Sequence, residues 1–296
     1  MNIKIAGIYR GMQYSPNHIG NDAAIFNLTA QYLKAKGCEV TEYSEEEFWG
    51  ATLNVDAVFN MVRDTRSIKK LQALEDAGLK IINSAYGIEN CTREKMTRLL
   101  VSNGVPHPKS VIMSTTHIDI KELMPLHTDE YWIKRGDFHA IHREDVTFVR
   151  GAEEAEHILK EYALRNIPSA VINKHLPGDL IKFYGIAGTD FFYWFYPNDL
   201  SHSKFGLESI NGFAKGIPFD QEYLKSICMR SAEVLNVAIY GGDCVVSANG
   251  SIKIIDFNDW PSFAPCREEA APYVAESIYS SVTAHLQKKQ AVQYAS

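Results

Sequence analysis

The sequence predicts a mixed fold, with an α/β lobe at the N-terminus followed by α+β lobes. Short apolar strands alternate with helical segments through residues 1–90, which is typical of a parallel sheet with crossover helices. Beyond them, strand patterns follow one another more closely and end in a hairpin within residues 240–263. A chain of 296 residues is long enough for two or three subdomains around a large buried core.

The N-terminal lobe is expected to contain four strands, at residues 3–8, 40–43, 56–62 and 80–83. One helix begins near Asn21 and ends at Gly37, and a second begins at Ser67 and ends at Gly78. Asn and Ser are favoured helix caps, and glycine commonly follows the last helical turn. These start and stop residues separate the strands as a parallel α/β lobe requires.

The remaining elements are also bounded by turn-forming residues. A helix begins at Thr92 and ends before Gly104 and Pro106. Further strands are expected at residues 109–113, 130–134, 145–150, 170–175, 180–187 and 190–196. Further helices are expected at residues 151–166, 219–236 and 268–289.

The hairpin carries three oxygen-bearing side chains at one end. Its two runs, rich in Val, Ile and Phe, are residues 243–247 and 251–257. Asp243 opens the first strand, while Asp256 and Asn258 are two apart on the second and so face the same side. Carboxylates beside apolar strands need a partner, and hard oxygen ligands suit Mg²⁺ shared with phosphate. The alternative is an exposed hairpin end with solvated acids.

Composition limits the classes of partner. A net charge of −6 argues against nucleic-acid and anionic-membrane partners, which need a basic surface. No apolar run reaches the length of a membrane span, and the N-terminus lacks a signal-peptide pattern. The five cysteines are scattered, as expected for reduced thiols in the cytosol. We expect a cytoplasmic protein with a small-molecule substrate, and a homodimer is left open.

The hairpin resembles the metal-binding end of the ATP-grasp superfamily, where an Asp on one strand and Glu/Asp-x-Asn on the next bind Mg²⁺ beneath ATP. Three more segments are similar in order and spacing. Lys95 matches a lysine on the helix before a Gly-Val-Pro turn, and Lys134 matches a strand lysine that contacts the α-phosphate. Residues 171–176, followed by Pro-Gly-Asp, match the linker that holds adenine and ribose.

The resemblance implies a Rossmann-like domain at residues 1–90 and an ATP-grasp domain at residues 91–296. A small lobe at about 110–170 and a C-terminal lobe at about 171–296 clasp ATP. The cofactors are then ATP and one or two Mg²⁺ ions, with Mn²⁺ as a substitute, and the metal ligands are Asp243, Asp256 and Asn258. The nucleotide-binding residues are Lys95, Lys134, Lys174, His175, Leu176, Asp179 and Lys182.

Several of these assignments have ordinary alternatives. Lys134 could be an edge-strand lysine that reaches solvent, and Lys95 could belong to a solvated helix face. The strand near Lys174 is expected to offer edge backbone groups to adenine, with Asp179 near the ribose and Lys182 facing phosphate.

The segment from Arg135 to Asp145 takes the place of a glycine-rich phosphate loop but contains a single glycine, Gly136. Its side chains could supply the charge that backbone N–H groups normally supply. We therefore predict Lys134, Arg135 and Arg143 as catalytic residues. A surface loop with incidental histidines is the alternative.

The acceptor is expected beyond the carboxyl ends of the N-terminal strands, where ligands bind in open α/β sheets. The loops there carry Arg10, Tyr14, His18, Arg63 and Arg66. Arginine suits bidentate recognition of carboxylate or phosphate, whereas capping or ion pairing is the alternative, chiefly for Arg66. The predicted substrate residues are Arg10, His18, Arg63, His139 and His142.

Two reactions fit the resemblance. ATP-grasp ligases, such as D-alanine–D-alanine ligases, glutathione synthetases and glutamate ligases, activate a carboxylate as an acylphosphate for attack by an amine or thiol. We prefer this ligase function. The motif DFNDWPSF at residues 256–263 is also similar to that of ATP-grasp inositol polyphosphate kinases, whose anionic hydroxyl acceptors need a basic pocket. A catalytically silent nucleotide-binding protein would lack metal ligands and is ranked last.

Overall fold

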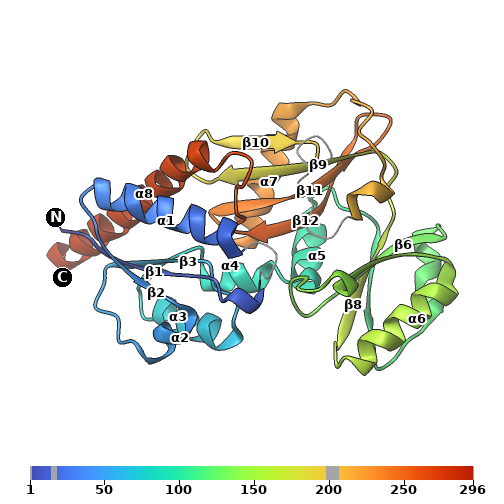
Figure 1. Ribbon diagram of the computed structural model, residues 1–296, viewed down its shortest axis with the longest axis horizontal. Helices are drawn as coiled ribbons and strands as arrows, with labels where there is room; N and C mark the ends of the chain where they lie inside the picture. Colours follow the sequence, from blue (N-terminus) through green and yellow to red (C-terminus); the bar gives the residue numbers. More distant parts are fainter. Residues whose placement is uncertain (1, 15–18, 198–206, 296) are drawn as a thin grey trace.

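The computed structural model describes residues 2–14, 19–197 and 207–295, and it contains three four-stranded sheets that follow one another along the chain (Figure 1). The mixed α/β and α+β architecture predicted from the sequence is confirmed. The second sheet has its own apolar core, whereas the first and third sheets share one core cluster and each has a further cluster of its own. The predicted strands all occur, with ends shifted by a few residues at most.

The first sheet is parallel, in the order β2-β1-β3-β4. Its strands are β1 (Lys4–Ile8), β2 (Glu39–Tyr43), β3 (Ala57–Asn60) and β4 (Lys80–Ile82). The helices of this lobe are α1 (Ile19–Ala35), α2 (Glu45–Gly50), α3 (Thr65–Asp76) and α4 (Ala85–Asn90), with a 3-10 turn η1 at Met12–Tyr14. The alternation of strands and crossover helices therefore determined the parallel topology.

Two details of this lobe differ from expectation. The cap of α3 is Asp64, not Ser67, because the Asp64 carboxylate accepts hydrogen bonds from the N–H groups of Arg66 and Ser67. The helices α2 and α4 were not predicted from the sequence. Each has only six residues, too few for a helical period to be recognised.

The second sheet is antiparallel, in the order β5-β8-β6-β7. Its strands are β5 (Ser110–Ser114), β6 (Glu130–Arg135), β7 (Val146–Arg150) and β8 (Ser169–Lys174). The helix α6 (Gly151–Leu164) packs on β6, β7 and β8, and two 3-10 segments, η2 (Ile120–Leu126) and η3 (Arg143–Asp145), lie between strands. The buried face of α6 includes Ala155, Leu159 and Tyr162, as its periodicity predicts.

The third sheet is also antiparallel, in the order β10-β9-β11-β12. Its strands are β9 (Asp179–Ile186), β10 (Phe192–Phe195), β11 (Ile239–Val246) and β12 (Ile252–Asp259). The helices α5 (Arg93–Ser102) and α7 (Gln221–Leu235) pack together in its core, and η4 covers Leu207–Ile210. The predicted hairpin is confirmed as β11–β12, with a register shift directly after Asp243.

The last helix, α8 (Arg267–Ala295), returns to the N-terminal lobe. It packs beside α1, and both chain ends lie at the same end of the molecule (Figure 1). One core cluster accordingly joins Phe26 and Phe59 to Ala271 and Val274. The boundary near residue 90 stays a prediction, because the C-terminal helix shares a core with the N-terminal sheet.

Within the part of the chain that is described, no helix has the length and apolar character needed to cross a membrane.

Candidate active site

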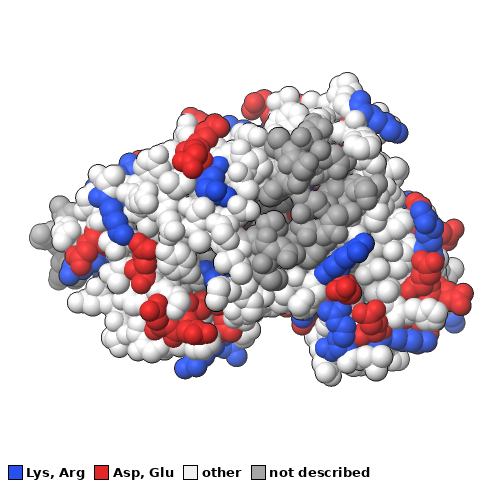
Figure 2. All heavy atoms as spheres, in the orientation of Figure 1, with Lys and Arg blue, Asp and Glu red and all other residues white. Residues whose placement is uncertain are grey.

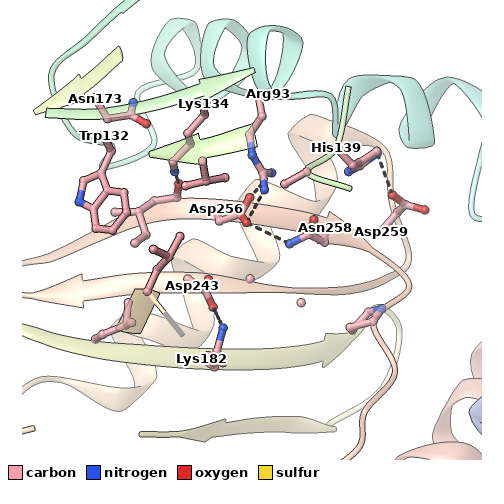
Figure 3. Close-up of a pocket in the computed structure, with 18 of the residues that line it drawn as sticks. Arg93, Trp132, Lys134, His139, Asn173, Lys182, Asp243, Asp256, Asn258 and Asp259 are labelled. Atoms are coloured by element: carbon pink, nitrogen blue, oxygen red, sulfur yellow. Dashed lines mark hydrogen bonds and ion pairs between the residues drawn. The ribbon is translucent and has the colours of Figure 1, made fainter. Parts of the chain in front are cut away.

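A cavity of about 290 Å³ lies where the three sheets meet, and residues from all three lobes line it (Figure 3). One end is formed by the β11–β12 hairpin and the cations around it, which we call the hairpin end. We name the other two ends after the ligands that the sequence resemblance leads us to expect there. The β6 and β8 strands form what we call the nucleotide end. The loops after β1 and β3, together with the residues after β12, form what we call the acceptor end.

At the hairpin end, the structure brings the three predicted metal ligands to one cavity wall. Asp243 on β11 is the direct register partner of Asp256 on β12. The Asn258 amide donates to the Asp256 Oδ2 atom at 3.3 Å. The two carboxylates and the amide therefore share one face, as their spacing predicts.

Each carboxylate has a cation from another element. Two guanidinium nitrogens of Arg93 on α5 donate to the two oxygens of Asp256, with the Nη2–Oδ2 distance at 2.7 Å. The Lys182 ammonium on β9 lies 3.0 Å from Asp243 Oδ1. Lys134 on β6 donates from Nζ to the Ile255 carbonyl at 2.7 Å. Three cations thus surround two carboxylates in one cavity (Figure 3).

Burial and charge shift the proton equilibria here in opposite directions. Burial lowers the pKa of Lys134 to about 8, although the Asp256 carboxylate opposes this shift. Burial alone would raise the pKa of Asp256, but Arg93 and Lys134 lower it, so this carboxylate stays ionised near neutral pH. A buried ammonium of this kind is stabilised by an anionic partner, which a phosphate supplies.

The donor set fits Mg²⁺ that is shared with a nucleotide. Within the described ranges, no three His, Cys, Asp or Glu side chains gather closely enough to hold a metal ion by themselves. Two carboxylates and one amide, however, suit an ion that keeps waters and binds phosphate oxygens. Asp243, Asp256 and Asn258 would hold it, and the ion would compete with Arg93 and Lys182 for the carboxylates.

The nucleotide end is more apolar. Trp132, Val146, Leu176 and Leu180 line it together with Asn173. Such a slot suits the face of a planar base. Lys174 also lines the cavity, and its Nζ lies 3.3 Å from the His127 carbonyl.

The expected free edge near Lys174 is not there. β8 lies between β5 and β6, and the N–H groups of Lys174 and His175 donate to the carbonyls of Lys109 and Glu130. The prediction that the strand before Leu176 offers free backbone groups to adenine was therefore wrong. In a central strand, the backbone N–H and C=O groups form hydrogen bonds with both neighbouring strands.

Three predicted nucleotide-binding residues lie outside the cavity lining. The Lys95 ammonium is half-exposed and lies 2.6 Å from Glu89. The buried Asp179 carboxylate accepts from the N–H groups of residues 215 and 217 at 2.8 and 2.7 Å, so it orders a loop. His175 accepts at Nδ1 from the Trp132 indole at 3.1 Å. Their predicted contacts with ATP find no support in this geometry.

The segment from Arg135 to Asp145 places one of its four basic side chains in the cavity. That residue is His139. Arg135 instead pairs with Asp137 at 3.0 Å, and neither Arg143 nor His142 lines the cavity. The predicted roles of Arg135 and Arg143 in catalysis, and of His142 in substrate binding, are not supported by their placement.

The acceptor end contains two arginines, each paired with a buried aspartate. Arg10 Nη1 lies 3.0 Å from Asp22, and its Nη2 donates to the Trp260 carbonyl at 3.0 Å. Arg63 pairs with the Asp259 carboxylate and also donates to the Asp259 carbonyl at 3.0 Å. Both arginines line the cavity, as predicted, and they donate hydrogen bonds to neighbouring carboxylates and backbone carbonyls of the protein.

Two other residues of the predicted acceptor site are placed differently. The Arg66 guanidinium lies over the Trp49 ring at 5.0 Å, away from the cavity lining. His18 lies outside the described residues.

Sequence reasoning missed six charged or aromatic residues of this site: Asp22, Arg93, Trp132, Tyr184, Asp259 and Trp260. Arg93 is two residues before Lys95 and occupies the place expected for that lysine. The sequence did contain a signal for Arg93, because Arg93 is the first residue of the helix on which Lys95 had been predicted to bind the nucleotide. Asp22 and Asp259 gave no signal, since their partners are Arg10 and Arg63 from other parts of the chain.

Charges on the outer surface are mixed rather than segregated by sign. On the face shown in Figure 2, acidic and basic side chains are interspersed over the second lobe, where α6 lies. Ion pairs within α6, such as Lys160 with Glu156 at 2.6 Å, account for part of this pattern.

Comparison with solved structures identifies the architecture. The chain is similar to D-alanine–D-alanine ligase from Bacillus anthracis, with a TM-score of 0.70 and 13% identity over 97% of this chain and 99% of that one. The ligase from Coxiella burnetii gives a TM-score of 0.70 and 14% identity over 99% and 98% of the two chains. A RimK domain ATP-grasp protein from Sphaerobacter thermophilus gives a TM-score of 0.65 and 14% identity over 93% and 99%.

Comparison by sequence finds no family model and no curated protein that matches the chain. The structural similarity nevertheless extends over nearly the whole of this chain and of each neighbour. It agrees with the superfamily resemblance drawn from the sequence. This chain has the ATP-grasp fold.

Proposed function

We propose that this protein is a Mg²⁺- and ATP-dependent ligase. In this proposal it activates the carboxylate of a small molecule or peptide as an acylphosphate, which an amine or thiol attacks with release of ADP and phosphate. The observation that carries the proposal is the hairpin end, where two carboxylates and three basic side chains from different elements line one cavity. The shared fold with D-alanine–D-alanine ligases supports it.

In this proposal, the basic side chains of the site bind the phosphates, and the acidic and amide side chains bind the metal ion. Lys134, Lys182 and Arg93 bind and orient the phosphates, and their positive charge stabilises the transferred phosphoryl group. Asp243, Asp256 and Asn258 would hold Mg²⁺, which neutralises phosphate charge when bound. This type of reaction needs positioning and charge stabilisation and no covalent nucleophile from the protein.

The charge of the acceptor end favours a ligase over an inositol phosphate kinase. Arg10 is balanced by Asp22, and Arg63 is balanced by Asp259. Arg135 is turned away to Asp137. A polyphosphorylated acceptor requires a strong excess of positive charge, whereas these paired groups suit a substrate of low net charge.

Calorimetry with ATP and Mg²⁺ tests the nucleotide site. The double variant Asp256→Ala/Asn258→Ala should lose Mg²⁺-dependent ATP binding, because it removes the two proposed metal ligands on β12 and leaves only Asp243 on β11. Asp190→Ala, at an exposed carboxylate of the same lobe, is the matched control and should bind as wild type does. Equal ATP affinity in wild type and double variant, with and without metal, would overturn the site.

The reaction type is tested by ADP release. A coupled assay against pools of amino acids, peptides, hydroxy acids and inositol phosphates should show turnover only when a carboxylate and an amine or thiol are both present. Turnover with a hydroxyl acceptor alone would refute the ligase and support the kinase.

A further inference from the structure

The loop of residues 136–145, between β6 and β7, stands where the resemblance places a flexible glycine-rich loop, yet its beginning is fixed. The Gly136 N–H donates to the Ser169 carbonyl at 2.7 Å, and the Gly136 carbonyl accepts from the Glu94 N–H at 2.9 Å. A Cβ atom on Gly136 would lie 2.4 Å from Ser169 Oγ. Glycine is therefore needed for close packing here, and its N–H is already used.

The end of the same loop is fixed by one carboxylate. Asp145 is fully buried, and its Oδ2 accepts from the N–H groups of Ile141 and His142 at 2.9 and 3.0 Å. Its Oδ1 accepts from the Arg165 guanidinium at the end of α6, and Arg135 Nη1 lies 3.6 Å from Oδ2. Burial alone would raise the pKa of Asp145, but these donors outweigh it and lower the pKa.

The middle of the loop contacts the other two lobes. The Phe138 ring lies 5.8 Å from the ring of Tyr14, which belongs to the N-terminal lobe. His139 lines the cavity, and its Nε2 lies 3.8 Å from Oδ1 of Asp259 at the end of β12 (Figure 3). A loop of ten residues thus delivers one imidazole to the point where all three lobes meet.

We propose that Asp145 is a positioning residue, which holds this loop in its cavity-facing conformation before a nucleotide binds and so presents His139 as a preformed group. The proposal rests on the proposed function for what His139 meets, namely the phosphates and the acceptor. A flexible loop would turn its N–H groups toward phosphate. Here the N–H groups of Ile141 and His142 are bonded to Asp145, so fixed side chains take over that task.

Hydrogen exchange of the intact protein without nucleotide gives the first test. The amides of Gly136, Ile141 and His142 should already be protected, and adding ATP with Mg²⁺ should change their exchange rates by about twofold or less. Rapid exchange in the free protein, followed by strong protection with nucleotide, would show a loop that orders around its ligand and would overturn the proposal.

Substitution of Asp145 gives the second test. Asp145→Asn keeps the size of the side chain but removes the charge that faces Arg165. Exchange at Ile141 and His142 should then accelerate by about tenfold or more, because charge-assisted hydrogen bonds are lost. Glu161→Gln is the matched control, since Glu161 also faces Arg165, at 3.7 Å, but does not touch the loop. Unchanged exchange in Asp145→Asn would overturn the proposal.

Two further measurements separate positioning from folding and from the ligase function. If Asp145→Asn does not fold, Arg165→Lys replaces it, because it keeps the positive charge but loses the planar guanidinium. Its exchange at Ile141 and His142 should also accelerate, though less. No acceleration would overturn the proposal.

If Asp145→Asn folds, its kcat should fall at least about tenfold while its Kd for ATP changes little. Adding His139→Ala to Asp145→Asn should lower kcat little further. Additive losses would overturn the delivery of His139. The exchange results stand whether or not the ligase reaction is found.

Discussion

The hairpin end and the acceptor end of the cavity both contain paired arginines and aspartates, but the pairs are built differently. At the hairpin end, Arg93 and Asp256 meet side chain to side chain, and the Asp256 side chain retains 15% exposure to the cavity. At the acceptor end, the Asp259 side chain is 0% exposed, and Arg63 also donates to two backbone carbonyls. A ligand can therefore reach the Arg93–Asp256 pair, whereas the Arg63–Asp259 pair is buried and is also held by hydrogen bonds to the backbone.

This difference shows that similar ion pairs can have different tasks. A buried pair contributes little net stability when formed, yet removing one partner is costly because it leaves an unpaired charge. Arg63 comes from the loop after β3, and Asp259 ends β12, so this pair joins the N-terminal lobe to the third sheet. Arg10 adds a second link through the Trp260 carbonyl. We infer that the acceptor-end pairs hold lobes together, whereas the hairpin-end pairs await phosphate and metal.

The largest effect that would sharpen this comparison is expected for Arg63→Ala. The variant leaves Asp259 buried without its cation and should lower the free energy of unfolding by about 3–5 kcal/mol. Urea unfolding measures this. Arg66→Ala, at an exposed arginine three residues away, should change stability by less than about 0.5 kcal/mol. Equal stability of the two variants would show that the Arg63 pair is not structural.

A pH effect should appear beside the hairpin end. Burial lowers the pKa of His107 from 6.5 to about 4, and its Nε2 has no hydrogen-bond partner among the described residues. The unfolded state therefore binds a proton that the folded state refuses, so stability falls as pH drops from 6.5 toward 4. The loss approaches roughly 3 kcal/mol.

His107→Gln should remove this part of the acid sensitivity. His117→Gln, at an exposed histidine, serves as the control and should leave the acid dependence as in wild type. Urea unfolding at several pH values between 7 and about 4 gives the slope. The same slope in wild type and His107→Gln would place the acid sensitivity elsewhere.

A smaller effect, on binding rather than stability, is expected from two positions on α5. Arg93→Ala removes one of the three cations proposed to bind the phosphates, and it should weaken binding of ATP with Mg²⁺ by about 10- to 100-fold, or about 1.5–3 kcal/mol. Lys95→Ala loses only a half-exposed pair with Glu89 and should bind ATP as wild type does. Calorimetry compares them. A greater loss from Lys95→Ala would restore the original assignment of that lysine.

The different placement of Lys95 and Arg93 has a simple geometric cause. Consecutive residues on a helix are rotated by about 100°, so positions 93 and 95 point to nearly opposite sides. Matching by residue type selected the lysine, whereas the ion pair with Asp256 on β12 holds Arg93 at the cavity. For Lys134, in contrast, the strand places alternate residues on opposite faces, and the lysine does line the cavity.

Local pattern by itself determined the strands, most helices, the parallel first sheet and the common face of Asp256 and Asn258, because these depend on periods of two and of 3.6 residues and on nearby caps. Tertiary structure alone decided which charges meet. Arg93 and Asp256 are 163 residues apart, and Arg63 and Asp259 are 196 apart. Such pairs form only when whole lobes dock, and burial then determines whether a charge is kept for a ligand or used to hold the fold.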